Sequence, residues 1–214
     1  MIETIHVINL SPDSFIDPYA NPELKKNIAR WRQENVLSIS AQSKQHGFSC
    51  RFWEGNTEEE VFRSGNISRA FKQIVRYAKE KNLPMVTIME DDGVLTSPNS
   101  WKYYNDNLPE DFDLYLGGIY AGQLEENRIV NGWSGNTLLT VHKNFYDFFL
   151  SANEDPLGLG QGHLDRWLGN FCFEKKYFVV RPFVVKQINN SYSDNHRRVQ
   201  NYDAYEEKWE YYQD

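Results

Sequence analysis

The chain of 214 residues has few cysteines and no long hydrophobic run, and each shortage excludes a class of protein. Cys50 and Cys172 form no metal or redox spacing and suggest no disulfide framework, so a reducing compartment is expected. No apolar stretch approaches the length of a transmembrane helix, and the N-terminal residues lack the basic start and apolar run of a signal peptide. We therefore expect a cytoplasmic protein, at most peripheral to the inner face of a membrane.

Positive charge is outnumbered, with 23 Lys and Arg against 30 Asp and Glu, and no lysine or arginine precedes Lys25. The formal net charge of −7 argues against broad, charge-driven binding to nucleic acid or to an anionic membrane, although it permits a local basic pocket. The composition, 40% hydrophobic and 15% aromatic, suits one domain. We assign it to residues 1–200, followed by an acidic, aromatic tail at 201–214 that either docks as a helix or extends freely.

Apolar runs of strand length alternate with helical patterns along the chain. Helices are expected at 21–47, 66–82, 97–106, 143–152 and 162–171, and strands at 4–10, 48–55, 83–89, 111–118, 128–141 and 177–187. The clearest helix, 66–82, has an apolar stripe at helical spacing, formed by Ile67, Ala70, Phe71, Ile74, Val75 and Ala78. The alternation predicts a single-domain α/β fold with a mainly parallel central sheet flanked by helices.

The first helix and the last strand carry local signals. Asn21 can cap the helix, Pro22 suits its first position, and Gly47 is a plausible C-terminal stop. Pro182 lies inside the apolar run 177–187 and indicates an edge strand or a bulge.

Three adjacent carboxylates, Glu90, Asp91 and Asp92, follow the apolar run "MVTIM". In an open α/β sheet, ligands bind beyond the carboxyl ends of the strands. Side chains of an extended chain alternate in direction, so Glu90 and Asp92 could share one ligand while Asp91 faces elsewhere. A hard divalent cation such as Mg²⁺ or Mn²⁺ takes such oxygen ligands. The alternative is an acidic turn that stays solvated.

The surroundings of these carboxylates resemble glycosyltransferase family 25. The resemblance rests on "VINL", "FWEG", "ISRAFKQIVRYAKEKNLPMVTIMEDDGVL" and "FDLYLGG" in that order, and it covers roughly the first 120 residues. It implies a GT-A-type fold, a nucleotide-sugar donor, by default a UDP-sugar, and a Mn²⁺ or Mg²⁺ ion. The acidic triplet would stand for the Asp-x-Asp signature, with Glu90 and Asp92 as metal ligands and Asp91 near the donor. This chain departs from the family after the first strand, where the family often has basic residues and this chain has none before Lys25.

The same resemblance assigns roles to residues elsewhere in the chain. In the stretch "NNSYSDNHRR", His196 would complete the metal shell, and Arg197 and Arg198 would neutralise the departing diphosphate. The alternative for this stretch is a polar loop before a solvated basic pair. Asn9 and Leu10, at the end of the first strand, would lie at the donor.

Asp165 in "GLGQGHLDRW" is the candidate catalytic base. It lies at the start of an expected helix, after a glycine-containing loop, where inverting GT-A enzymes often place a carboxylate that takes the proton of the acceptor hydroxyl. Asp155 is the fallback base and His163 a weaker one. The alternative for Asp165 is a surface charge favoured by the helix dipole. Inversion is implied by the resemblance, because spacing alone does not decide between retention and inversion.

Three further residues are candidates for donor contacts. Gly117 and Gly118 end a strand without side chains, so backbone could approach a ligand there, although a tight turn would use them equally well. Trp133 could stack on a sugar ring or belong to the core or its rim.

The predicted activity is therefore transfer of a sugar to a hydroxyl acceptor. The resemblance makes a bacterial surface saccharide the expected acceptor, and protein hydroxylysine suits a small cytosolic chain less. A modified nucleobase of viral DNA is disfavoured by the acidic charge. Two rival classes remain. A metal-dependent nucleotidyltransferase would usually show a glycine- and basic-rich loop after the first strand, which "INLSPDSFIDP" does not supply. A non-catalytic nucleotide-sugar-binding module is disfavoured by the intact carboxylates. The sequence does not fix the oligomeric state.

Overall fold

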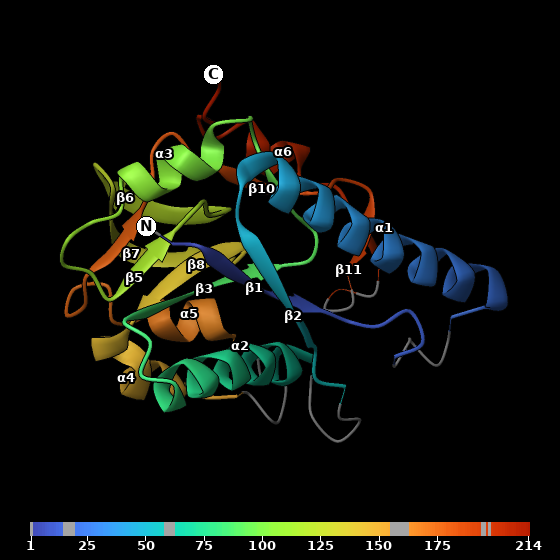
Figure 1. Ribbon diagram of the computed structural model, residues 1–214, viewed down its shortest axis with the longest axis horizontal. Helices are drawn as coiled ribbons and strands as arrows, with labels where there is room; N and C mark the ends of the chain where they lie inside the picture. The colour runs from blue at the N-terminus through green and yellow to red at the C-terminus, as the bar shows by residue number, and fades with distance from the viewer. Residues whose placement is uncertain (1, 15–19, 58–62, 155–162, 194–195, 197) are drawn as a thin grey trace.

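The computed structural model describes residues 2–14, 20–57, 63–154, 163–193, 196 and 198–214. Its centre is an eight-stranded sheet in the order β2-β1-β3-β8-β5-β9-β7-β6 (Figure 1). These strands are β1 (Thr4–Asn9), β2 (Ser49–Glu54), β3 (Met85–Glu90), β5 (Leu114–Leu116), β6 (Ala121–Glu125), β7 (Arg128–Ser134), β8 (Leu138–His142) and β9 (Tyr177–Val179).

The sheet is mixed, so the prediction of a mainly parallel sheet is wrong. Strand β1 pairs in parallel with β2 and β3, and β5 with β9. The pairings β3–β8, β5–β8, β7–β9 and β6–β7 are antiparallel. The physical reason lies between 114 and 142, where β5, β6, β7 and β8 follow one another without a helix, so no crossover returns the chain in the parallel direction.

Helices cover both faces of the sheet. On one face, α2 (Arg63–Glu80) packs with α4 (Tyr146–Leu150) and α5 (Leu164–Gly169), the 3₁₀ turn η1 (Lys143–Phe145) leading into α4 (Figure 1). The expected stripe of α2 is buried from Ala70 to Ala78 and forms this part of the core. The other core cluster contains Ile39 of α1 (Pro22–His46) and Trp101 of α3 (Ser100–Asp106).

Helix α1 has the boundaries that its sequence predicted. The Asn21 side chain accepts a hydrogen bond from the backbone N–H of Leu24, and Pro22 opens the helix. Gly47 ends it in the left-handed conformation, with φ of 74°, which a glycine adopts without steric cost. This long helix leads the chain back to β2, beside β1.

The expected strand 177–187 is divided in two at Pro182. Residues up to Val179 form β9 in the main sheet, whereas β10 (Val185–Gln187) leaves it and pairs with β4 (Gly93–Leu95) in a small antiparallel sheet. In this pairing Gln187 lies opposite Gly93, directly after Asp92. The break at Pro182 therefore carries Gln187 to the carboxylates at the end of β3.

The C-terminal residues pack against the domain. A hairpin of β11 (Ser191–Ser193) and β12 (Arg198–Gln200) precedes α6 (Asp203–Glu206). The backbone N–H of Phe183 donates to Glu210, and that of Tyr212 donates to Phe183, both at 2.8 Å. The indole N–H of Trp209 donates to the carbonyl of Tyr120 at 3.0 Å. Among the described helices, none has the length and hydropathy that crossing a membrane requires.

Candidate active site

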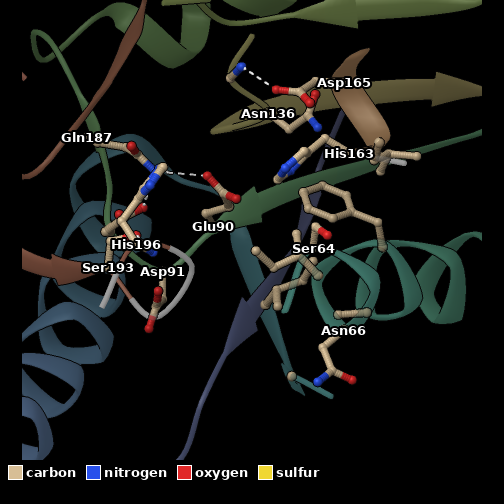
Figure 2. A pocket seen from close by; sticks show the side chains of 18 of the residues that line it. Ser64, Asn66, Glu90, Asp91, Asn136, His163, Asp165, Gln187, Ser193 and His196 are labelled. Carbon is tan, nitrogen blue, oxygen red and sulfur yellow. Dashed lines mark hydrogen bonds between the residues drawn. The ribbon is translucent and has the colours of Figure 1, made fainter. Parts of the chain in front are cut away.

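A cavity of about 420 Å³ opens at the carboxyl ends of β1 and β3 (Figure 2). Its lining combines regions that are far apart in the sequence, among them the end of β3, the start of α5, and the segment from Gln187 to the hairpin β11–β12. Asn9 and Leu10 line it at the end of β1, and Ser64 and Asn66 line it from α2. This is the edge at which ligands bind in open α/β sheets.

Glu90 and Asp92 meet at one side chain. The Nε2 of Gln187 donates to Oε2 of Glu90 at 2.9 Å and to Oδ1 of Asp92 at 3.0 Å (Figure 2 draws the first bond). The Oε1 of Gln187 accepts from the hydroxyl of Tyr120, which also lies 3.2 Å from Oγ1 of Thr137. Glu90 and Asp92 therefore share one partner, although Asp92 lies in the turn between β3 and β4 and not in an extended strand.

The environment of these carboxyl groups resists a double negative charge. Burial raises the pKa of Glu90 well above its ordinary value, and the charges of Asp92, Asp91 and Asp165 raise it further, against the hydrogen bond from Gln187. Burial also raises the pKa of Asp92 to about 6. Binding of a proton or a cation near the two groups would relieve this repulsion.

Asp91 has different surroundings. In Figure 2 its carboxylate points away from that of Glu90. Its backbone N–H donates to the carbonyl of Ile8 at 3.1 Å, which fixes the end of β3 against β1. Asp91 also lines a second, smaller cavity of about 60 Å³ together with Arg32 and Tyr192. It is therefore placed at the boundary between the two cavities.

Asp165 lies in the first turn of α5 and lines the main cavity. Its Oδ2 accepts from the backbone N–H of Gly135 at 2.9 Å, and its Oδ1 from that of Arg166 at 2.8 Å (Figure 2 draws the first bond). Both oxygens are held by backbone donors, so the carboxylate has a defined orientation. It is near enough to Glu90 for its charge to raise the pKa of that group.

Histidine and arginine side chains form another part of the lining: His163, Arg166, His196 and Arg198. Partial burial lowers the pKa of His196, and the nearby charges of Arg198, His163 and Arg166 lower it further. The cavity thus has an acidic side at the end of β3 and a basic side at α5 and β12. A ligand carrying both negative charge and hydroxyl groups matches this division.

The donor chemistry of the acidic side suits a hard divalent cation, because two carboxylate oxygens converge on one point. Within the described part of the chain, however, no three His, Cys, Asp or Glu side chains are grouped to hold a metal ion. His196 lines the cavity and keeps an exposed surface. Glu90 and Asp92 therefore fit a cation whose remaining ligands include water and phosphate oxygens, as is usual for Mg²⁺.

Several other predicted residues lie apart from the cavity lining. Trp133 is 4% exposed, packs edge-on against Tyr177, and donates from its indole N–H to Asn136, which does line the cavity. Gly117 and Gly118 are buried against β10, where an added Cβ would lie within 3 Å of Val185. Their small size thus serves strand packing. Arg197 and the fallback base Asp155 fall outside the described residues.

Sequence reasoning missed Gln187, Tyr120 and Asn136 as site residues. Gln187 is 8% exposed and ends the apolar run "FVVKQ", so a buried polar residue at a strand end was the available signal. No comparable signal marks Tyr120, which follows a short loop after β5 and reaches Gln187 only through the fold.

No family model matches the chain, and no curated protein matches it in sequence. Solved structures do resemble it in fold. The inositol-1-phosphate CTP transferase from T. maritima superposes with a TM-score of 0.54 at 13% identity, covering 96% of this chain and 94% of that one. A glycosyltransferase involved in the glycosylation of the major capsid of PBCV-1 gives 0.50 at 12% identity, covering 85% and 83%.

A third structure is the Drosophila β1,4-galactosyltransferase 7, solved as a mutant in complex with manganese, UDP-Gal and xylobiose. It gives a TM-score of 0.50 at 9% identity and covers 92% of this chain and 74% of that one. At such identities the likeness shows the fold. The chain has the GT-A-like α/β fold that glycosyltransferases and nucleotidyltransferases share.

Proposed function

We propose that this protein is a glycosyltransferase that moves a sugar from a nucleotide-sugar donor to a hydroxyl acceptor. One observation carries the proposal: Glu90 and Asp92 converge on a single point at the carboxyl end of β3, and Asp165 borders the same cavity on a separate element. The arrangement separates a group that can hold the charged end of the donor from a group that can take a proton. The GT-A-like fold supports this division.

In the proposed reaction, the oxygen of the acceptor hydroxyl forms a bond to the anomeric carbon of the sugar. The bond from that carbon to the diphosphate oxygen breaks, and the nucleoside diphosphate leaves with the electron pair. The hydroxyl proton passes to the carboxylate of Asp165, whose orientation is held by the N–H groups of Gly135 and Arg166. A direct displacement of this kind inverts the anomeric centre.

Other lining residues have positions that suit a nucleotide sugar. Asn9, Leu10 and Asp91 border the cavity at β1 and β3, where we place the nucleoside. Arg166 and Arg198 border it on the basic side and would offset the charge of the departing diphosphate. A divalent cation held by Glu90 and Asp92 would supply further neutralisation of that charge.

The identities of the donor, the cation and the acceptor are inferred from the sequence resemblance to family 25. We propose a UDP-sugar donor, Mn²⁺ or Mg²⁺ as the cation, and a saccharide as acceptor. The complex of the Drosophila neighbour with manganese, UDP-Gal and xylobiose supports this set of ligands in a GT-A-like fold.

The test is a thermal-shift and hydrolysis screen of nucleotide sugars with and without Mn²⁺. The matching donor should raise the melting temperature and be hydrolysed slowly, whereas other sugars and bases should do neither. Asp92→Ala should abolish turnover while the circular dichroism of the fold is kept. If no nucleotide sugar changes the melting temperature and none is hydrolysed, the proposal is wrong.

A nucleotidyltransferase is the second candidate, favoured by the likeness to the T. maritima CTP transferase over 96% of this chain. That activity would consume a nucleoside triphosphate and a sugar phosphate and release pyrophosphate. We rank it second because the chain has no Lys or Arg before Lys25 that could hold a triphosphate after β1. Release of pyrophosphate from a triphosphate with a sugar phosphate present would reverse the ranking.

A further inference from the structure

Gln187 occupies the point at which the two carboxylates converge, and its orientation follows from hydrogen-bond chemistry. The NH₂ group of the amide faces Glu90 and Asp92 and donates to one oxygen of each carboxyl group. The amide oxygen then faces Tyr120, whose hydroxyl donates to it. Gln187 is 8% exposed, so its amide is confined to this network.

A cation between the carboxylates would reverse this requirement. The N–H groups of Gln187 would then point at a positive charge, which repels them, whereas its carbonyl oxygen would be attracted. Turning the amide by half a turn about its last side-chain bond exchanges the oxygen and the nitrogen without moving β10. Amide oxygens are ordinary ligands of hard divalent ions.

Tyr120 can serve both orientations, because a phenol hydroxyl donates one hydrogen bond and also accepts. With the amide oxygen toward it, Tyr120 donates to Gln187. With the NH₂ group toward it, Tyr120 would accept, and its proton could turn to Oγ1 of Thr137, 3.2 Å away. The network therefore stays paired in either state.

We propose, resting on the metal-dependent activity proposed above, that Gln187 is the third protein ligand of the cation and binds it through Oε1 after its amide turns over. Glu90 and Asp92 form a site with two carboxylates, and no His, Cys, Asp or Glu among the described residues completes a group of three with them. The amide oxygen of Gln187 would supply the missing protein ligand. In the cation-free state the NH₂ group of the same amide binds both carboxylates. The backbone N–H of Ile188 donates to the carbonyl of Asp92 at 2.8 Å and fixes the two segments together.

The test is a titration of the full chain with Mn²⁺ in the presence of UDP, followed by electron paramagnetic resonance of free Mn²⁺. Gln187→Leu keeps the approximate size and removes the oxygen, so Mn²⁺ affinity should fall about tenfold or more. An amide that only blocked the site would give the opposite sign, because its removal would tighten binding. Unchanged or tighter binding therefore overturns the proposal, as does a wild-type chain that binds no Mn²⁺.

Gln42→Leu is the matched control. Gln42 is also 8% exposed, but its amide pairs with backbone atoms of Gly93 and Leu95. The variant Gln42→Leu should lose stability as Gln187→Leu does, but its Mn²⁺ affinity should equal that of the wild type. If Gln187→Leu fails to fold, Gln187→Glu replaces it, since an oxygen is retained: Mn²⁺ should raise its melting temperature more than that of the wild type, and an equal or smaller rise overturns the proposal.

A second readout is independent of activity. The side-chain amide signals of Gln187 in a ¹⁵N–¹H spectrum, assigned by their loss in Gln187→Glu, should shift when diamagnetic Mg²⁺ and UDP are added. Signals that stay in place while Mg²⁺ binds would overturn the proposal. Donor hydrolysis by a wild type whose Gln187 does not respond would leave the glycosyltransferase assignment standing and refute only the role of this residue.

Discussion

Tyr202 stacks on Tyr120, with ring centroids 5.3 Å apart and ring planes at 15°. Tyr120 in turn holds the amide of Gln187, which binds Glu90 and Asp92. The segment 201–214 therefore supports the acidic side of the cavity through this aromatic pair and through the hydrogen bond from Trp209 to the carbonyl of Tyr120.

This stacking predicts the effect of Tyr202→Ala. Loss of the stacked ring leaves Tyr120 less constrained, so we expect the fold to remain and the affinity for Mn²⁺ with UDP to fall about three- to tenfold. Tyr212→Ala is the control, because Tyr212 stacks on Tyr103, with centroids 4.2 Å apart, and packs against the core cluster that contains Ile39 and Trp101. Isothermal titration of both variants decides the matter, and equal losses would refute a specific role for Tyr202.

Asp165→Asn should separate binding from chemistry. The asparagine keeps the shape of the side chain and an oxygen for the N–H of Gly135, but it no longer takes a proton. We expect kcat to fall by about 10²- to 10⁴-fold with the donor Kd nearly unchanged. Asp147→Asn, at an exposed ion pair with Lys79, should change neither value. A normal kcat for Asp165→Asn would show that another group takes the proton.

Asp92→Asn should stabilise the cation-free protein above about pH 6. Burial raises the pKa of Asp92 from 3.8 to about 6, so the folded state binds a proton more tightly than the unfolded chain. Stability of the wild type is then lost as pH rises through this window, and asparagine has no such loss. We expect a gain of about 1–2 kcal/mol in the free energy of unfolding at pH 8.

Urea unfolding in a chelator at pH 4 and pH 8 measures this difference. The gain should be largest at pH 8 and shrink toward pH 4, where Asp92 is protonated in the folded state. A gain that does not depend on pH would point to a cause other than this titration.

The affinity for Mn²⁺ should also depend on the ionisation of Asp92, but it should increase as pH rises, whereas the stability of the cation-free protein decreases. A proton on Asp92 competes with the cation, so Mn²⁺ affinity should fall as pH drops through about 6. Titrations at pH 5 and pH 7.5 test this, and equal affinities would contradict it.

Lys72→Met should destabilise the fold strongly. Lys72 is 4% exposed, and its Nζ donates to the carbonyl of Ala152 and to Oε1 of Glu154. Its loss leaves a buried carbonyl and part of a carboxylate unpaired, which costs about 2–4 kcal/mol. Lys79→Met, at the exposed pair with Asp147, should cost less than about 1 kcal/mol. Similar losses in the two variants, measured by urea unfolding, would contradict the burial argument.

The sequence predicted the elements of this fold better than their arrangement. The Asn21 cap, the Gly47 stop and the apolar stripe of α2 act within one or two turns, so local chemistry determines them. The directions of β5 to β8 depend on which strands pair across the sheet, and short apolar runs such as 138–142 do not encode a partner. For that reason the mixed sheet was not foreseen.

The residues of the candidate site also differ in whether local sequence or tertiary contacts determine their positions. Glu90 ends β3 and Asp92 lies two positions later, in the turn before β4, so their convergence is a local property. Gln187 joins them because the chain leaves the main sheet at Pro182 and pairs β10 with β4, a tertiary event. Trp133 shows the converse, since its sequence left a sugar contact and a core position open, and the fold places it in the core.

The order of these pieces along the chain has a consequence for biosynthesis. Gln187 is separated from Glu90 by 97 positions, and Tyr202 emerges later still. A nascent chain that has already formed β1, β2 and β3 carries two crowded acids with no amide beside them. We expect such ribosome-bound intermediates to leave this edge of the sheet unformed, so that competence to bind a ligand appears only after the segment that contains Gln187 and Tyr202 has been translated.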